Sequence, residues 1–244
     1  MSRRLLLVLA HPDDESMGNG TLITRHVAAG CELHLVCATR GAAGWTGRPA
    51  GRRPEELTRI RAEELARAAE VLQLASVELW DYPDGGVTGC NQDEIVERVR
   101  VAVERLEPDV VVGWGPDGGY GHPDHIAIGA CTDRAVAGSG KPHYHMAVDK
   151  RAADAFNNLV TSQRLDVGSM HLVAVEPVDV ILQPSPEELA IIGRAIACHD
   201  SQRNAFVDRM LNNPRLLFWM ARSCYVRVSG DRGDVATDLL PELA

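Results

Sequence analysis

Apolar runs that alternate with segments of helical periodicity dominate the first half of the chain. Arg3–Ala10 is a continuous apolar run, the pattern of a strand buried on both faces of a parallel sheet. Three further strands are predicted at Glu32–Thr39, Val77–Trp80 and Asp109–Trp114. The last of these holds three valines between a proline and a glycine. These four runs predict the central strands of one sheet.

Helical patterns separate these strands. Residues 16–29 predict a helix that Gly30 ends. The Gly-, Arg- and Pro-rich residues 40–53 predict a loop, and Pro54 then opens a helix that runs to about Leu72. Residues 81–89 are turn-rich. Residues 93–106 have an amphipathic helical pattern, with apolar side chains at every third or fourth position.

The second half of the chain is less regular. A helix is expected near Ile126–Ala137, and a short strand is expected near His143–Val148. Residues 150–170 are polar and predict no element. Strands near Val173–Leu182, a helix from Pro186 to about Cys198 and a last strand at Cys224–Val228 complete the pattern.

The order of these elements predicts the fold class. Strands that alternate with helices indicate an α/β fold with a Rossmann-like, doubly wound, mainly parallel sheet and helices on both faces. No internal repeat, low-complexity segment or linker interrupts the chain. We therefore expect residues 1–244 to form a single domain.

Composition narrows the class of partner. The net charge of −9 argues against a general nucleic-acid or anionic-membrane binder, although Arg48, Arg52 and Arg53 lie close together in sequence. No apolar stretch approaches the length of a membrane span and no signal segment is evident. Six cysteines without a Cys-x-x-Cys pair indicate reduced thiols. We expect a cytoplasmic protein; the sequence leaves open whether it forms a homo-oligomer.

Two clusters of histidine and carboxylate residues carry the candidate chemistry. Residues 10–15 read Ala-His-Pro-Asp-Asp-Glu, directly after the first predicted strand, and residues 120–125 read Tyr-Gly-His-Pro-Asp-His, shortly after the strand at 109–114. Ligands of open α/β sheets bind at the carboxyl ends of the strands. The two clusters are therefore expected to meet at one edge of the sheet.

Together the clusters offer the donors of a catalytic metal site. Such a site uses three protein ligands and keeps one position open, and imidazole with carboxylate suits zinc or iron(II). Two histidines and one carboxylate would hold the ion, another carboxylate would act as base and the remaining histidine would stabilise an oxyanion. The available donors are His11, Asp13, Asp14, Glu15, His122, Asp124 and His125.

The paired motifs resemble those of the PIG-L/LmbE-like zinc N-deacetylases, a family that includes deacetylases of N-acetylglucosaminyl-inositol and amidases of thiol conjugates. The His199-Asp-Ser-Gln202 segment is also family-like. The resemblance implies a small N-acetylated sugar as substrate and Zn²⁺ as cofactor, with Fe²⁺ as the alternative. It assigns His11, Asp14 and His125 as metal ligands and Asp13 as the general base that deprotonates metal-bound water.

The resemblance also gives roles to residues around the ion. His122 becomes the imidazolium that stabilises the oxyanion and protonates the leaving amine, and Asp124 orients a histidine. Tyr120 would lean over the substrate carbonyl. Arg61 and Asp84 match positions that contact the sugar in mycothiol-pathway relatives.

One position departs from the family pattern. Many relatives carry a glutamate in the Gly-rich loop after the second strand, where this chain has Ala42. The substrate inferred from the family resemblance is therefore less secure than the inferred reaction. Two other functions stay open at this point. One is an amidase that cleaves a larger amide, such as a thiol conjugate or an antibiotic acyl-amide. The other is a non-catalytic metal- or sugar-binding protein, for which a base and an acid would be unnecessary.

Overall fold

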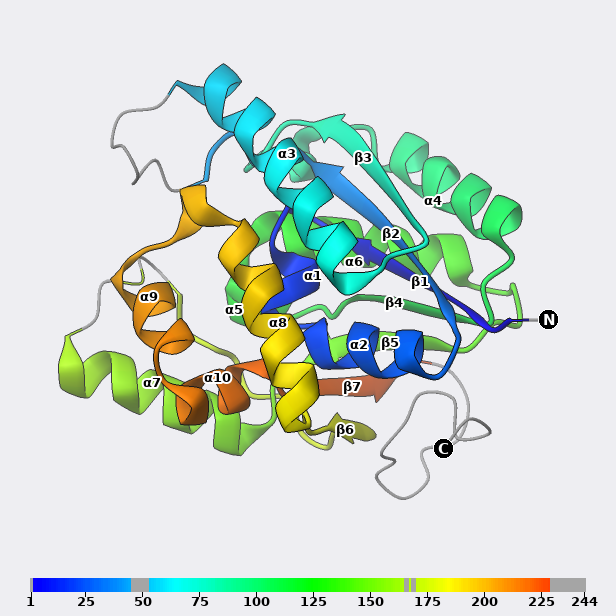
Figure 1. Ribbon diagram of the computed structural model, residues 1–244. Coiled ribbons are helices and arrows are strands. Elements are labelled where there is room, and N and C mark those ends of the chain that lie inside the picture. Colours follow the sequence, from blue (N-terminus) through cyan, green and yellow to red (C-terminus); the bar gives the residue numbers. More distant parts are fainter. Residues whose placement is uncertain (1, 45–52, 165–166, 168–169, 229–244) are drawn as a thin grey trace.

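One seven-stranded sheet organises the molecule. In this computed structural model, which describes residues 2–44, 53–164, 167 and 170–228, the strand order is β3-β2-β1-β4-β5-β7-β6 (Figure 1). Arg48 and Arg52 of the predicted basic loop lie outside the described residues. So do residues 229–244, and the prediction of a single domain over the whole chain therefore stays a prediction.

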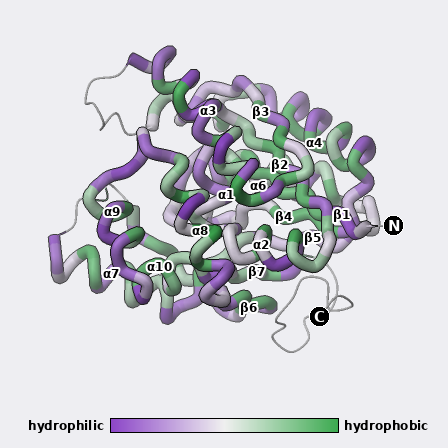
Figure 2. Tube along the Cα trace, in the orientation of Figure 1, coloured by the Kyte–Doolittle hydropathy of each residue, from purple (hydrophilic) through white to green (hydrophobic). Residues whose placement is uncertain are grey.

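The first five strands of the chain run parallel to one another. They are β1 (Arg4–Leu9), β2 (Glu32–Thr39), β3 (Ser76–Tyr82), β4 (Val110–Trp114) and β5 (His143–Ala147). Two antiparallel strands, β7 (Ser223–Arg227) and β6 (Val180–Leu182), extend the sheet beyond β5. The mainly parallel, doubly wound sheet is thus confirmed. Figure 2 shows hydrophobic strands at the centre and mixed colouring on the outer helices.

Helices cover both faces of the sheet, as predicted (Figure 1). On one face, α2 (Gly20–Ala28) and α3 (Pro54–Leu72) pack against α8 (Pro186–Cys198). On the other face, α4 (Gln92–Leu106) packs against α6 (Pro123–Val136). Because the chain moves from β1 to β2 and β3 on one side and later to β4 and β5 on the other, the topological switch point lies between β1 and β4.

Three helices form a cap on the side where the parallel strands end. They are α7 (Lys150–Gln163), α9 (Ala205–Leu211) and α10 (Pro214–Ala221). With α8 they share a second, smaller hydrophobic core, separate from the core around the sheet. The sequence analysis predicted none of these three helices. The sequence did carry a helical pattern at α7, because Asp149 caps its N-terminus and its apolar residues recur at helical spacing: Ala152, Phe156, Leu159 and Val160.

Two other predictions were wrong in detail. Residues 16–29 do not form one helix: α1 (Asp14–Met17) ends at Gly18, where an added Cβ would lie 2.8 Å from Met146 Cε. Residues 173–179 are not a strand, and only β6 pairs there. The short helices α5 (Gly118–Gly121), η1 (Val87–Gly89) and η2 (Asp200–Gln202) complete the described elements. Within the described part of the chain, no helix is both long and apolar enough to cross a bilayer.

Candidate metal centre and active site

The first histidine-carboxylate cluster lies where β1 ends and α1 begins. The Asp14 carboxylate folds back onto the strand, and its Oδ2 accepts the backbone N–H groups of Ala10 at 3.1 Å and His11 at 2.9 Å. Its Oδ1 lies 3.5 Å from His125 Nε2 in the second cluster. The backbone of the β1–α1 turn therefore fixes one oxygen of Asp14 and leaves the other turned toward His125.

The second cluster is positioned by a glycine-rich turn after β4. Gly118 and Gly119 have φ angles of 60° and 73°, and a Cβ on Gly119 would lie 2.8 Å from Trp114 Cζ3, so this turn favours glycine on two grounds. The Gly118 carbonyl accepts a hydrogen bond from His125 Nδ1 at 3.0 Å. Trp114 stacks on the imidazole of His125, with ring centroids 3.8 Å apart. Together these contacts direct His125 Nε2 toward the first cluster.

The three predicted metal ligands come together in the structure. His11 Nδ1 lies 3.1 Å from His125 Nε2, and it lies 3.8 Å from Asp14 Oδ2. Ligand bonds of about 2.0–2.1 Å in a tetrahedral zinc site imply ligand atoms roughly 3.3 Å apart. The two histidine nitrogens are therefore spaced for a small divalent cation. Asp14 approaches them with different oxygens, Oδ2 toward His11 and Oδ1 toward His125, and it is not part of the compact group of donor atoms that His11, His122 and His125 form. His122 also has a ring nitrogen within 4.8 Å of donor atoms on His11 and His125.

A pair of carboxylates holds the outer nitrogen of His11. His11 Nε2 lies 3.0 Å from Asp84 Oδ1 and 3.2 Å from Asp124 Oδ2. Asp124 is itself fixed by the backbone N–H groups of Gly85 and Val87. Burial would lower the pKa of His11, but its bonds to Asp124 and Asp84 and the charge of Asp14 raise that pKa to about 10. The carboxylate–imidazole arrangement is the one that orients metal-binding histidines.

Asp13 has an unusual backbone conformation and a half-buried carboxylate. Its φ of 115° is rare for a residue with a side chain, and such strain persists only where the surroundings impose it. Glu15 Oε2 accepts the Asp13 backbone N–H at 2.9 Å, and Arg61 Nη2 lies 3.0 Å from Asp13 Oδ2. Burial raises the pKa of Asp13 to about 6, although the charge of Arg61 opposes the rise. A pKa near neutrality suits a general base.

The sequence analysis counted Glu15 among the available donors but did not predict its contact with Asp13. Glu15 is fully buried, and its Oε1 lies 2.7 Å from His199 Nε2 and 2.5 Å from Ser16 Oγ. Burial would raise the pKa of Glu15, but the charge and hydrogen bond of His199 lower it. The position of Glu15 directly after the Asp-Asp pair was visible in the sequence. Its role in holding Asp13 was not, because His199, the residue that pairs with Glu15, lies 184 positions away.

His122 differs in one respect from its predicted state. It is the N-cap of α6, and its Nδ1 accepts the backbone N–H of Asp124 at 3.2 Å. A protonated Nδ1 could not accept this bond. Burial and the nearby charge of His11 also lower the pKa of His122. These observations favour a neutral imidazole with its proton on Nε2 over the predicted imidazolium.

The remaining predicted residues line a polar cavity of about 320 Å³ beside the three candidate ligands. Tyr120 lies against both His122 and His125, with ring centroids 5.6 and 5.3 Å away. Arg61 is buried, with its guanidinium also bonded to the carbonyls of Gly41 and Pro12. Asp84 Oδ2 accepts the backbone N–H of Ala43 at 2.7 Å, in the loop that carries Ala42. Arg61 and Asp84 thus have protein partners besides facing the cavity.

Comparison with known proteins places the chain in a family. The model of the PIG-L family, described as GlcNAc-PI de-N-acetylase, matches residues 6–136. The chain belongs to the PIG-L family. The matched segment contains both histidine-carboxylate clusters, so the predicted family resemblance is confirmed.

A curated relative is the 1D-myo-inositol 2-acetamido-2-deoxy-alpha-D-glucopyranoside deacetylase of Kineococcus radiotolerans. It is 34% identical over 168 residues, which cover 57% of this chain and 46% of the relative. The chain thus spans about half the length of the curated relatives it matches.

Solved structures support the fold. An N,N'-diacetylchitobiose deacetylase from Pyrococcus horikoshii superposes with a TM-score of 0.65 and 20% identity over 93% of this chain and 84% of that chain. A 4-carboxy-2-hydroxymuconate hydratase from Pseudomonas putida superposes with a TM-score of 0.63 and 16% identity, over 95% and 98% of the two chains. Because a deacetylase and a hydratase share this fold, the reaction has to be argued from the site.

Proposed function

We propose that this chain is a metal-dependent hydrolase that removes the acyl group from the nitrogen of an N-acetylglucosamine-type amino sugar. Three lines support the proposal. The chain belongs to the PIG-L family, its relatives carry deacetylase names, and the described site combines a candidate metal-ligand set with a separate, half-buried carboxylate, Asp13. The last observation carries the proposal, because a protein that only binds metal has no need of a base near neutrality.

The ion would be held by His11 Nδ1, Asp14 and His125 Nε2. Asp14 is preferred to His122 as third ligand because its free Oδ1 faces His125, whereas one His122 nitrogen already caps α6. Zinc is the proposed ion and iron(II) the alternative. When bound, such an ion polarises the acyl carbonyl and increases the acidity of water.

The residues around the ion carry the proton transfers. Asp13 takes a proton from the attacking water as the new C–O bond forms at the acyl carbonyl. His122 donates a hydrogen bond from Nε2 to the developing oxyanion. As the C–N bond breaks, Asp13 returns the proton to the leaving nitrogen, and the products are a carboxylate and a free amine. Proton return by Asp13 replaces the predicted acid role of His122, because a neutral imidazole has no proton to spare.

Other residues position these groups. Arg61 and Glu15 hold Asp13, Asp124 orients His11, and Tyr120 closes the site beside the carbonyl. In the polar cavity, Arg61 and Asp84 are the proposed contacts for the sugar, as the family resemblance implies.

The test is acetate release from a panel of N-acetylglucosaminides by protein stripped of metal and then restored with zinc or iron(II). We expect metal-dependent release by the wild type and loss of at least about 100-fold in Asp13→Ala, with metal content unchanged. Release that needs no metal, or that survives in Asp13→Ala, would refute the proposed chemistry. Stoichiometric metal binding without release from any substrate would favour a binding role.

A further inference from the structure

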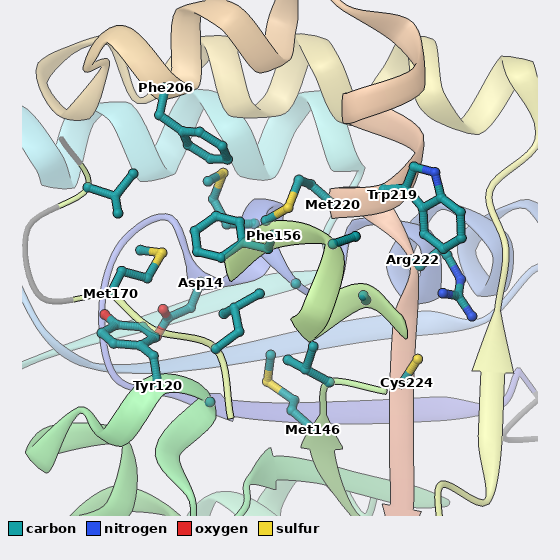
Figure 3. A pocket seen from close by; sticks show the side chains of 18 of the residues that line it. Asp14, Tyr120, Met146, Phe156, Met170, Phe206, Trp219, Met220, Arg222 and Cys224 are labelled. Carbon is teal, nitrogen blue, oxygen red and sulfur yellow. The ribbon is translucent and has the colours of Figure 1, made fainter. Parts of the chain in front are cut away.

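A second cavity, different in character, opens on the same catalytic residues. It measures about 400 Å³, and Asp13, Asp14 and Tyr120 line both this cavity and the polar one. Figure 3 shows Asp14 and Tyr120 at one side of it and Trp219 at the opposite side, with Phe156 and Met220 between them. The space therefore leads from the reacting centre into the helical cap.

The walls of this cavity are apolar. Phe156 of α7 and Phe206 of α9 are both buried and meet edge to face, with ring centroids 5.3 Å apart. Four methionines add flexible walls that adapt to different ligand shapes: Met17, Met146, Met170 and Met220. At the far side, Arg222 and Asp149 face each other, with Nη1 and Oδ2 2.9 Å apart. Besides the residues of the reacting centre, the charged and amide side chains that line these walls are Asp149, Asn204 and Arg222. An acetyl methyl group would leave most of the space empty.

The two cavities adjoin at the catalytic residues, where Met17, Met170, Asn204 and Val207 also line both, and they differ in their remaining walls. Arg61, Asp84 and His122 line only the polar cavity, whereas Phe156 and Trp219 line only the apolar one. An amide bound at Asp13 has an acyl substituent on one side and an amine substituent on the other. The side chains that line the polar cavity can bind the hydroxyl groups of an amino sugar. The acyl substituent of the amide would then lie in the apolar cavity.

We propose that this apolar cavity, named here the acyl pocket, holds the acyl group of the substrate, and that the enzyme prefers amides of medium-length alkyl or aromatic acids to acetamides. This inference rests on the proposed function, because it takes the amide to be cleaved at Asp13. It specifies the substrate class: an amino sugar whose nitrogen carries an apolar acyl group larger than acetyl.

The first test compares N-acetyl-, N-butyryl-, N-hexanoyl- and N-octanoylglucosamine in the zinc-loaded protein, with free glucosamine as the common product. Each buried methylene is expected to raise kcat/KM by about fourfold until the pocket is full. A decrease from the acetyl to the hexanoyl compound would overturn the inference and leave deacetylation standing. Loss of turnover with every substrate, the acetyl compound included, would instead count against the proposed function.

A pair of variants tests the location. Ala152 of α7 is half-buried and lines the acyl pocket, whereas Asn158 of the same helix is exposed and lines neither cavity. Ala152→Phe is expected to lower kcat/KM for the hexanoyl compound more than for the acetyl compound and so to abolish the preference between them. Asn158→Phe controls for the added ring and should retain the wild-type preference. An unchanged preference in a folded Ala152→Phe protein would overturn the inference.

Binding gives a readout that does not depend on turnover. Calorimetric titration of the wild type is expected to show octanoate binding more tightly than acetate, and Ala152→Phe, or Ala152→Leu if the larger variant does not fold, should remove the difference. Equal affinity for the two acids in the wild type would contradict an acyl pocket. Octyl N-acetylglucosaminide tests whether the aglycone, rather than the acyl group, occupies the cavity. If its kcat/KM exceeds that of the methyl glycoside while kcat/KM does not rise along the acyl series, the cavity binds the aglycone and the proposal is refuted.

Discussion

At the scale of single residues, the site is built from side chains whose polar atoms are nearly all committed. Asp14 uses one oxygen on the backbone and turns the other toward His125, and both candidate histidine ligands have an outer nitrogen held by an acceptor. Asp13 is held in a strained conformation by contacts to its backbone and to its side chain. Such preorganisation keeps a base and a metal-ligand set apart although they are neighbours in sequence.

Substitutions of Arg61 test whether its charge sets the pKa of Asp13. Because the charge of Arg61 lowers the pKa of Asp13, Arg61→Gln should raise that pKa and move the acid limb of the kcat/KM–pH profile to higher pH. Arg61→Lys keeps a charge and should move the limb less. A rise in KM with an unmoved acid limb would show that Arg61 acts on the sugar alone.

A substitution of Asp124 tests whether this carboxylate orients His11 for metal binding. Asp124→Asn replaces a carboxylate that accepts from the His11 ring, and metal affinity should fall by about 10- to 100-fold in a competition titration with a chelator. Asp154→Asn is the control because Asp154 is an exposed carboxylate of α7 that pairs with Lys150. Equal affinities in wild type and Asp124→Asn would show that Asp124 has no part in holding the ion.

At the scale of elements, the sequence predicts best where one physical signal is strong. The apolar run at 3–10 and the proline-initiated, acidic start of α3 were sufficient to place β1 and α3, the latter with its bounds at Pro54 and Leu72. The helix α7 was missed although its apolar residues recur at helical spacing and Asp149 precedes it as the N-cap. The apolar cavity could not be predicted at all, since its walls come from segments that only tertiary packing brings together.

Substitutions of Asp149 test how its helix cap and its ion pair with Arg222 stabilise α7. Its side chain caps the helix by accepting the N–H groups of Arg151 and Ala152, and it also faces Arg222 at 2.9 Å. Asp149→Ala should lower the free energy of unfolding by about 3–5 kcal/mol in urea denaturation, because a buried charge loses its partner. Asp149→Asn retains a capping oxygen, so it should be less destabilised than Ala by about 1 kcal/mol. Identical losses in the two variants would mean that the cap contributes nothing.

At the scale of the whole molecule, the site lies at the topological switch point between β1 and β4, beneath a cap with its own hydrophobic core. The segments that follow the strands of the sheet carry the proposed metal ligands and the proposed base, while the cap provides most of the apolar wall of the acyl pocket. This division explains how one fold can serve different substrates: the cap can change while the strand ends stay the same.

Metal binding should stabilise the molecule as a whole. At free zinc of about 100 times Kd, the free energy of unfolding should rise by about 2.7 kcal/mol, and a chelator should reverse the rise. Thermal denaturation of wild type, His125→Ala and Asp13→Asn measures this effect. The stabilisation should disappear in His125→Ala and persist in Asp13→Asn; an equal rise in all three proteins would place the ion elsewhere.

The central claim is that an ion held by His11, Asp14 and His125 works with Asp13 as base. The most direct measurement is a titration of metal-free protein with zinc while amine release from an N-acylglucosamine is followed in wild type and Asp13→Asn. We predict that the wild-type rate rises linearly and stops at about one equivalent, whereas Asp13→Asn binds the same equivalent and stays inactive. Equal rates in the two proteins, or a rate in the wild type that does not depend on zinc, would contradict the account.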